Sequence, residues 1–231
     1  MAQKLNNKDL QSCYYGQTEI DSIYYGDNLV WRGIKYVDLG SARTFNIKNY
    51  TDNWANLTAN NFFMVGNSGT ASLSGNDSDD SYIVYLYDGY RKVYDASTGS
   101  LTFEVYLYNA HSNTYAYGNV HAVLIENTAK LVSLGTGKSF NVRSYSNYGD
   151  FTYKNFLTLK PDFASGTNRE IGGVRNPRVW SASARARQSY SNGVFTCDFY
   201  GEYNHQNTGS GTPRTRSESM VVYLYPKKIL T

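Results

Sequence analysis

YVDLGSARTFNIKNY at Tyr36–Tyr50 and LVSLGTGKSFNVRSY at Leu131–Tyr145 are two versions of one stretch of sequence. They share Val, Leu-Gly, Phe-Asn and the final Tyr at an offset of 95 residues, and most remaining positions hold similar residues. Further matching pairs follow along each copy: Asn61-Phe62 with Asn155-Phe156, Thr102 with Thr196, Glu104 with Asp198, Tyr106 with Tyr200, His111 with His205, and Ala122–Ile125 with Val222–Tyr225. Because such self-similarity marks duplicated structural units, the chain contains two copies of one unit.

Each copy has the sequence pattern of β-strands. Residues 101–108 alternate between an apolar set and a polar or aromatic set: Leu101, Phe103, Val105 and Leu107 against Thr102, Glu104, Tyr106 and Tyr108. Period-2 alternation predicts a strand with one face in the core and the other in solvent. The 23 Tyr and 20 Gly residues suit strands and turns, and no segment has a clear helical period. We expect an all-β protein.

Three domains are expected: an N-terminal arm and β-hairpin anchor at 1–34, a first β-sandwich repeat at 35–128 and a second at 129–231. A repeat of this length is close to an immunoglobulin-like antiparallel sandwich. We therefore expect two such sandwiches in tandem after the hairpin arm. A single larger sandwich made of two duplicated halves is the alternative.

The N-terminal segment contains CYYGQTEIDSIYYGDNLVWRG, in which YYG occurs twice and predicts two short hairpins. Isolated hairpins are marginally stable in water, so we expect this segment to bind a domain or a partner. The predicted anchor residues are Ile23, Tyr24, Tyr25, Leu29, Val30 and Trp31.

Composition and charge narrow the function classes. No apolar run approaches the roughly 18 residues of a membrane-spanning helix, and MAQKLNNKDLQS lacks the apolar core of a signal peptide, so we expect neither a membrane partner nor export. Cys13 and Cys197 are too few for a disulfide scaffold.

The two halves of the chain differ in charge: residues 1–127 carry 8 Lys plus Arg against 13 Asp plus Glu, whereas residues 128–231 carry 14 against 6. This division favours stacking of copies or docking between acidic and basic partners over nucleic acid.

Two motifs resemble parts of tailed-bacteriophage virion proteins. Ile23-Tyr24-Tyr25-Gly26-Asp27-Asn28-Leu29-Val30-Trp31 is similar to a pattern I-x-Y-x-G-[DS]-x-x-V-W near the ends of such structural proteins, and Leu134–Val142 resembles the LGTG-x-SF-x-V opening of their β-sandwich modules. The first copy departs from this opening, with Ser41-Ala42-Arg43 where the second has Thr136-Gly137-Lys138. The resemblance implies a head fibre, decoration, collar or tail component of a virion, made in the cytoplasm of the bacterial host.

Catalytic and cofactor motifs are not found. There is no G-x-S-x-G elbow, P-loop, dinucleotide fingerprint or zinc spacing, and the three histidines are His111, His121 and His205. Cys197 precedes His205 by eight residues, but a small core residue is the simpler interpretation. Glu104 and Asp198 supply one carboxylate per repeat, whereas glycoside hydrolysis needs two in one site. The acidic loop at 76–80 lacks EF-hand spacing, so a solvated turn is preferred over calcium. We expect no enzyme activity, cofactor or metal.

Two groups of side chains are candidates for binding. The basic residues of the second half are a possible interface or basic face: Arg175, Arg178, Arg185, Arg187, Arg214 and Arg216. Arg185 and Arg187 alternate and so share one strand face, with Tyr190 near enough to stack on a base, although an interface with an acidic partner is preferred. Aromatic residues that could stack on sugars are Tyr85, Tyr87, Tyr106, Tyr108, Tyr115, Tyr117, Trp54 and Trp180.

The sequence thus favours a non-enzymatic structural component of a bacteriophage virion. Its expected partners are other virion proteins and copies of itself, reached through the N-terminal anchor and the sandwich surfaces. The alternative is a carbohydrate- or host-receptor-binding β-sandwich module.

Overall fold

The computed structural model describes residues 13–15, 18–20, 22–25, 28–32, 34–76, 83–160, 169–175, 179–206, 214–227 and 229. Side chains are described for 34–75, 86–160, 179–204, 215–227 and 229. Every helix in these ranges is a short 3-10 helix, and the remaining regular structure consists of strands. The all-β prediction is confirmed.

In its described residues the first repeat contributes seven strands and three 3-10 helices: β5 (Tyr36–Ala42), β6 (Thr44–Asn46), η1 (Ile47–Asn49), η2 (Asp52–Asn56), η3 (Ala59–Asn61), β7 (Phe62–Met64), β8 (Ala71–Asn76), β9 (Ile83–Asp95), β10 (Ser100–Asn109) and β11 (Thr114–Ile125). The second repeat follows the same order after η4 (Thr128–Lys130): β12 (Val132–Gly137), β13 (Ser139–Asn141), η5 (Tyr148–Asp150), η6 (Tyr153–Asn155), β14 (Phe156–Leu159), β15 (Arg169–Arg175), β16 (Val179–Ser191), β17 (Val194–Gln206), β18 (Arg214–Glu218) and β19 (Met220–Leu224).

The Leu-Gly pair of the repeated stretch forms the same irregularity in both copies. The pairing of β5 with β11 passes from Asp38 to Gly40 and skips Leu39, and the pairing of β12 with β19 passes from Ser133 to Gly135. The φ angles of the two glycines are +77° and +87°, a region that other residues rarely adopt. The repeated Leu-Gly therefore specifies a β-bulge.

The two repeats exchange one strand each. β8 of the first repeat pairs with β16 of the second, and β15 of the second pairs with β9 of the first. Between them β7 pairs with β14 through Met64 and Thr158, which are equivalent positions of the two repeats. A pseudo-two-fold axis therefore passes through this pair, and the repeats form one body of two duplicated halves.

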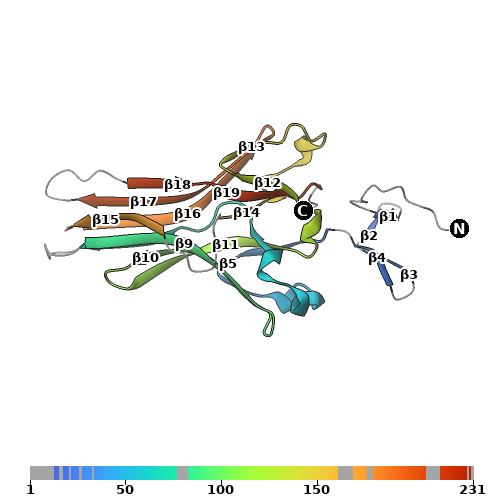
Figure 1. The fold of residues 1–231 in the computed structure, drawn as a ribbon, viewed down its shortest axis with the longest axis horizontal. Coiled ribbons are helices and arrows are strands. Elements are labelled where there is room, and N and C mark those ends of the chain that lie inside the picture. The colour runs from blue at the N-terminus through green and yellow to red at the C-terminus, as the bar shows by residue number, and fades with distance from the viewer. Residues whose placement is uncertain are drawn as a thin grey trace.

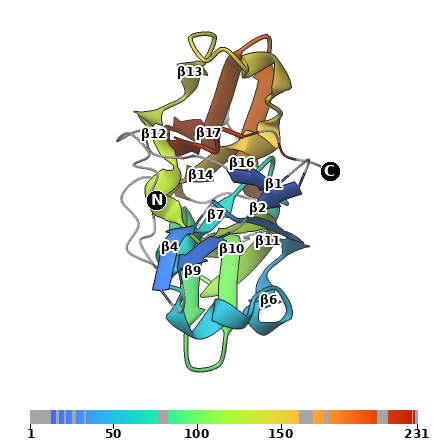
Figure 2. The same ribbon diagram turned by 90° about the vertical axis from the view of Figure 1, so that its right-hand side faces the viewer.

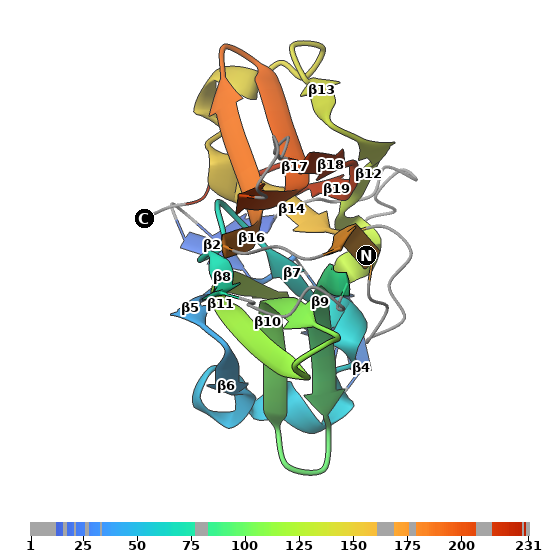
Figure 3. The ribbon, with the colours of Figure 1, turned by 90° about the vertical axis from the view of Figure 1, so that its left-hand side faces the viewer.

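The strands form two large sheets. The ten-stranded sheet runs β12-β19-β14-β7-β11-β10-β9-β15, with β5 on β11 and β6 on β10; the five-stranded sheet runs β13-β17-β16-β8, with β18 on β17. The β9–β10 and β16–β17 hairpins lie in opposite halves of the molecule, with β7 and β14 between them (Figures 2 and 3). Their inner faces contribute to one core, which contains Phe103, Val105, Ala186 and Phe199.

The alternation predicted for β10 is confirmed on its inner face and differs on its outer face. Leu101, Phe103, Val105 and Leu107 are buried, as expected. However, two outer residues, Glu104 and Tyr106, are also buried, at 1% and 5% exposure. Their neighbours, described below, cover them.

The N-terminal segment contains two antiparallel strand pairs, β1 (Cys13–Tyr15) with β2 (Thr18–Ile20) and β3 (Ser22–Tyr25) with β4 (Asn28–Arg32). They join neither large sheet and lie at one end of the molecule (Figure 1). Their strand pairing fits the two predicted hairpins, whereas the predicted anchoring role stays a prediction.

Candidate functional site

Five tyrosines gather on the outer face of the β9–β10–β11 sheet, and we call them the tyrosine face: Tyr87, Tyr106, Tyr108, Tyr115 and Tyr117. Antiparallel register places Tyr106 opposite Tyr117 and Tyr108 opposite both Tyr115 and Tyr87. The ring centroids of Tyr108 and Tyr115 are 4.4 Å apart, and those of Tyr115 and Tyr117 are 5.9 Å apart with nearly parallel planes. The rings therefore cover one another along the row.

A buried carboxylate lies beside this row. Glu104 Oε2 accepts from Arg43 Nε at 2.7 Å, and Glu104 Oε1 accepts from Arg91 Nη2 at 2.5 Å. The Arg43 guanidinium also lies 4.1 Å from the ring centroid of Tyr117, within cation–π range. Paired donors compensate the buried charge of Glu104, and the pair with Glu104 holds Arg43 against Tyr117.

A glycine allows Tyr106 to lie against the sheet. A Cβ atom on Gly89 would come within 2.5 Å of the Tyr106 hydroxyl, so no larger residue fits there without displacing the ring. Burial, together with nearby tyrosines and Asp88, raises the pKa of Tyr106 to about 12. The hydroxyl therefore stays protonated and can donate.

The second repeat keeps the ion pair and lacks the tyrosine row. Arg187 forms a bidentate pair with Asp198, equivalent to Arg91 with Glu104, and stacks 3.9 Å from the ring centroid of Tyr200. By strand register, the positions of Tyr108, Tyr115 and Tyr117 are taken by Glu202, Thr215 and Ser217. The tyrosine face is thus a feature of the first repeat.

The predicted basic face is divided. Arg185 and Arg187 share the outer face of β16, as predicted, and both line a groove of about 580 Å³. Arg216 lies on β18 with its Nε 2.7 Å from Glu218, at a register position of the opposite face. Arg178 lies outside the described residues, and the side chains of Arg175 and Arg214 do so as well.

The predicted anchor residues lie on the second N-terminal strand pair. Ile23 pairs with Trp31 and Tyr24 with Leu29, whereas Tyr25 and Val30 lie on the same two strands. Their side chains are outside the described residues, so their contacts stay a prediction.

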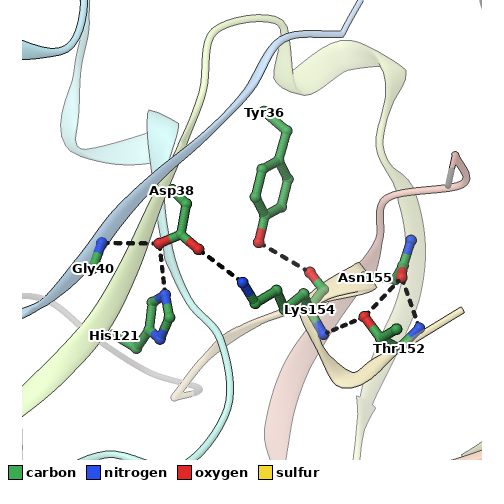
Figure 4. A network of polar contacts seen from close by, with 7 residues as sticks. All are labelled: Tyr36, Asp38, Gly40, His121, Thr152, Lys154 and Asn155. Carbon is green, nitrogen blue, oxygen red and sulfur yellow. Dashed lines mark hydrogen bonds and ion pairs between the residues drawn. The ribbon is translucent and has the colours of Figure 1, made fainter. Parts of the chain in front are cut away.

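A polar network joins the two repeats near the bulge of β5 (Figure 4). Asp38 Oδ1 lies 2.6 Å from His121 Nε2 and accepts from Gly40 N at 2.9 Å, while Asp38 Oδ2 accepts from Lys154 Nζ of the second repeat at 3.1 Å. Tyr36 Oη donates to the Lys154 carbonyl at 3.3 Å. Burial alone would raise the pKa of Asp38, but these hydrogen bonds outweigh it and hold the pKa below its ordinary value. The carboxylate therefore stays ionised and links the repeats.

No protein-family model, curated protein or solved structure matches this chain.

Cys197 and His205 lie too far apart along one strand to act as a catalytic pair. Cys197 is buried in the core, and burial followed by the charge of Asp198 raises the pKa of its thiol to about 12. His205 lies eight residues along the same strand, about 27 Å away at the rise of a β-strand. His111 occupies the turn after β10, where its amide donates to Asn109. Within the described residues no group of three or more His, Cys, Asp or Glu could hold a metal.

Other predicted binding residues have core or structural roles. Trp180 is buried beside Tyr203, and Lys48 covers the ring of Trp54. The ring of Tyr190 packs on Phe156 and its hydroxyl donates to the Tyr148 carbonyl. The side chain of Tyr85 is not among those described.

No helix in the described ranges is long and apolar enough to span a membrane.

Sequence reasoning missed a buried ion cluster. Lys160 is fully buried, with its Nζ 3.6 Å from Asp88 Oδ1 and 3.5 Å from Glu218 Oε2. Burial raises the pKa of Asp88. The positive charge of Lys160 lowers it and the negative charge of Glu218 raises it, and the net result is a pKa above the ordinary value. The three residues come from distant parts of the sequence, and the strand exchange brings them together. An Asp in the apolar run IVYLYDGY was the one available signal.

Proposed function

We propose that this protein is a non-enzymatic structural component of a bacteriophage virion that associates with copies of itself through the tyrosine face. The observation that carries the proposal is the row of five tyrosines flanked by Arg43 and Arg91. Tyr and Arg are, with Trp, the residues enriched in the energetic centres of protein interfaces. The virion setting rests on the resemblance of the N-terminal motif and of the repeat openings.

The geometry of the row favours a protein partner. Because Tyr108 and Tyr115 stack on each other, and Tyr117 lies parallel beside them, the row offers ring edges and hydroxyls more than open ring faces. A sugar stacks on an open ring face, whereas a protein surface can pack on edges and exchange hydrogen bonds with hydroxyls. Tyr side chains also lose little conformational entropy on binding.

The face is rigid before it meets a partner. The ion pairs to Glu104 fix Arg43 and Arg91, and the stacked neighbours fix Tyr115, which is 46% exposed. Preorganised side chains reduce the entropic cost of association. A two-fold contact between two such faces would bury both rows at once.

The test is the oligomeric state of the full chain by light scattering over a concentration series. The double variant Tyr108→Glu, Tyr115→Thr installs the residues that the second repeat has at these positions, so the strands should tolerate it. We expect oligomers of the wild-type chain to dissociate in this variant. The matched control, Glu202→Ala with Thr215→Ala, should leave them intact. A monomeric wild-type chain, or an oligomer that survives the tyrosine variant, would contradict the proposal.

The N-terminal anchor is tested separately by particle incorporation. Trp31→Ala should prevent the chain from entering particles while the sandwich stays folded, as judged by its thermal unfolding. Normal incorporation of this variant would remove the anchoring role and leave self-association through the tyrosine face unaffected.

A further inference from the structure

The groove above β16 and β17 is built from both repeats. Its floor carries Arg185 and Arg187 of β16 and Asp198 of β17, and one side is formed by Lys138 in the turn between β12 and β13. The other side is residues 67–70 of the first repeat, the segment that leads into the exchanged strand β8. The groove encloses about 580 Å³, enough for one or two sugar units.

The wall at 67–70 is fixed to the floor by hydrogen bonds. Ser68 N donates to the Ala186 carbonyl at 3.1 Å, and Ser68 Oγ accepts from Ala186 N at 2.9 Å. Asn67 Oδ1 accepts from Gln188 N at 2.7 Å, and Gln188 Oε1 accepts from Gly66 N at 2.9 Å. The groove is therefore held in shape without a ligand.

Among the described residues that line the groove, Lys138, Arg185 and Arg187 carry more positive charge than the one acid, Asp198, can neutralise. Asp198 is occupied by the bidentate contact with Arg187 and by Ser217 Oγ at 2.6 Å. Lys138 Nζ donates to the Ser217 carbonyl at 2.8 Å, and Arg185 is exposed. Among the side chains that the structure describes, neither Lys138 nor Arg185 forms an ion pair with an acid. Two cations remain for a ligand.

The first repeat shows why this surplus is specific to the second. There the longer Glu104 reaches both Arg43 and Arg91, the equivalents of Lys138 and Arg187, and the position of Arg185 is Gly89. The same framework thus pairs both of its cations with an acid in the first repeat, and leaves Lys138 and Arg185 without an ion pair among the described side chains of the second.

The remaining lining selects the ligand class. Thr70, Ser189 and Thr196 add hydroxyl groups, which suit sugar hydroxyls. Single-stranded nucleic acid would need open aromatic faces for base stacking. Tyr200 is covered by Arg187, and the ring of Tyr190 packs on Phe156 instead. We propose that this groove binds an acidic polysaccharide, with Lys138 and Arg185 contacting its carboxylate or sulfate groups. This site is independent of the tyrosine face.

The test is binding of defined probes to the full chain by calorimetry at low and physiological salt. Polygalacturonate supplies carboxylates, heparin supplies sulfates, dextran is a neutral control, and a 20-nucleotide single-stranded DNA represents nucleic acid. We expect one or both acidic polysaccharides to bind, dextran to give no signal and DNA to bind more weakly. A carboxylate-only or sulfate-only result identifies the group recognised.

The variants Lys138→Gln and Arg185→Gln should each weaken binding about tenfold, the usual worth of one charged hydrogen bond. Lys48→Gln removes one positive charge from an exposed position outside the groove and should leave affinity unchanged. Absence of polysaccharide binding by the wild-type chain, or equal affinity of the wild type and the Lys138→Gln, Arg185→Gln double variant, would overturn the proposal. DNA binding at least as tight as that of the polysaccharides would replace it with a nucleic-acid site.

Discussion

The two repeats share one backbone framework but carry different side chains on the outer faces of their sheets. The first covers its outer sheet face with tyrosines around a neutralised Glu104, whereas the second carries serine, threonine and uncompensated cations around Asp198. The interior differs in the same way. Where the first repeat has Gly118 against Gly69, the second has Glu218 beside the buried Lys160. The backbone geometry is thus shared, and the chemistry that could be used for binding is not.

The largest effect should come from separating the two halves. Because β8 and β15 are exchanged, residues 35–128 alone lose the partners of β8 and of one edge of β9. We expect this fragment to be unfolded as a monomer, while residues 35–231 unfold in one cooperative transition. Circular dichroism and light scattering measure both. If the fragment folds, it should do so as a dimer in which a second copy replaces the missing repeat, and a stable monomer would contradict the strand exchange.

Lys160→Met should have the next largest effect. It leaves the buried Asp88 and the partly buried Glu218 without the ammonium group, and breaking a buried ion pair typically costs about 3–5 kcal/mol. The folded-state pKa of Asp88, already raised by burial, should rise further. A carboxyl group whose pKa is raised by folding destabilises the folded state at pH values above its unfolded pKa of 3.8. The folded state binds the proton more readily as the pH falls, so this variant should regain stability between pH 7 and pH 5.

Urea unfolding at the two pH values measures this effect, and Asp88→Ala with Lys160→Met supplies the control. The double variant gives position 88 the residue found at the equivalent position of the second repeat, Ala184, and should lose most of the pH dependence. A single variant as stable as the wild type would show that the ion cluster does not stabilise the fold.

Gly118→Ala should cause a smaller loss of stability. Gly118 is the first-repeat equivalent of Glu218, which lies beside Lys160. A Cβ there would lie 2.4 Å from the Gly69 carbonyl oxygen, so backbone must move, at a cost of about 1–3 kcal/mol. Gly149→Ala is the matched control, since its Cβ meets nothing within 4 Å. Equal melting temperatures for the two variants would mean that the close approach of β11 and the 67–70 segment is not required.

The repeated sequence predicted the framework where a repeated residue has the same effect on the backbone in both copies. Leu39-Gly40 and Leu134-Gly135 form bulges, and Asn61 and Asn155 each donate from Nδ2 to a backbone carbonyl of the strand β11 or of Tyr225. These contacts are made within one repeat, so their residues recur at the repeat spacing and can be recognised.

The strand exchange could not be predicted in the same way. Strand partners within one repeat and between two repeats satisfy the same alternation, so the pattern does not say which copy β8 joins. The candidate sites depended on this choice. The tyrosines could be grouped by alternation along β10, but the groove needs residues 67–70 of the other repeat, and the Lys160 cluster needs strands from both.

The smallest predicted effect concerns Asp38, whose network with His121 and Lys154 is absent from the second repeat. The equivalent positions there are Ser133 and Val221, and Lys154 corresponds to Asn60 of the first repeat. Asp38 is about one third exposed, so solvent screens its charge and Asp38→Asn should cost only about 0.5–1 kcal/mol at pH 7. Because folding lowers the pKa of Asp38, its carboxylate stabilises the folded state at pH values above the unfolded pKa of 3.8. This stabilisation is lost as the pH falls through the folded-state pKa.

The difference in unfolding free energy between wild type and Asp38→Asn should therefore shrink between pH 5 and pH 2.5. Lys154→Gln in a double-mutant cycle isolates the link between the repeats, because the coupling energy should vanish over the same range. A coupling that persists at pH 2.5 would mean that the carboxylate charge is not what joins Asp38 to Lys154. The second repeat holds its bulge without this network, so the fold should survive Asp38→Asn, Lys154→Gln and the double variant.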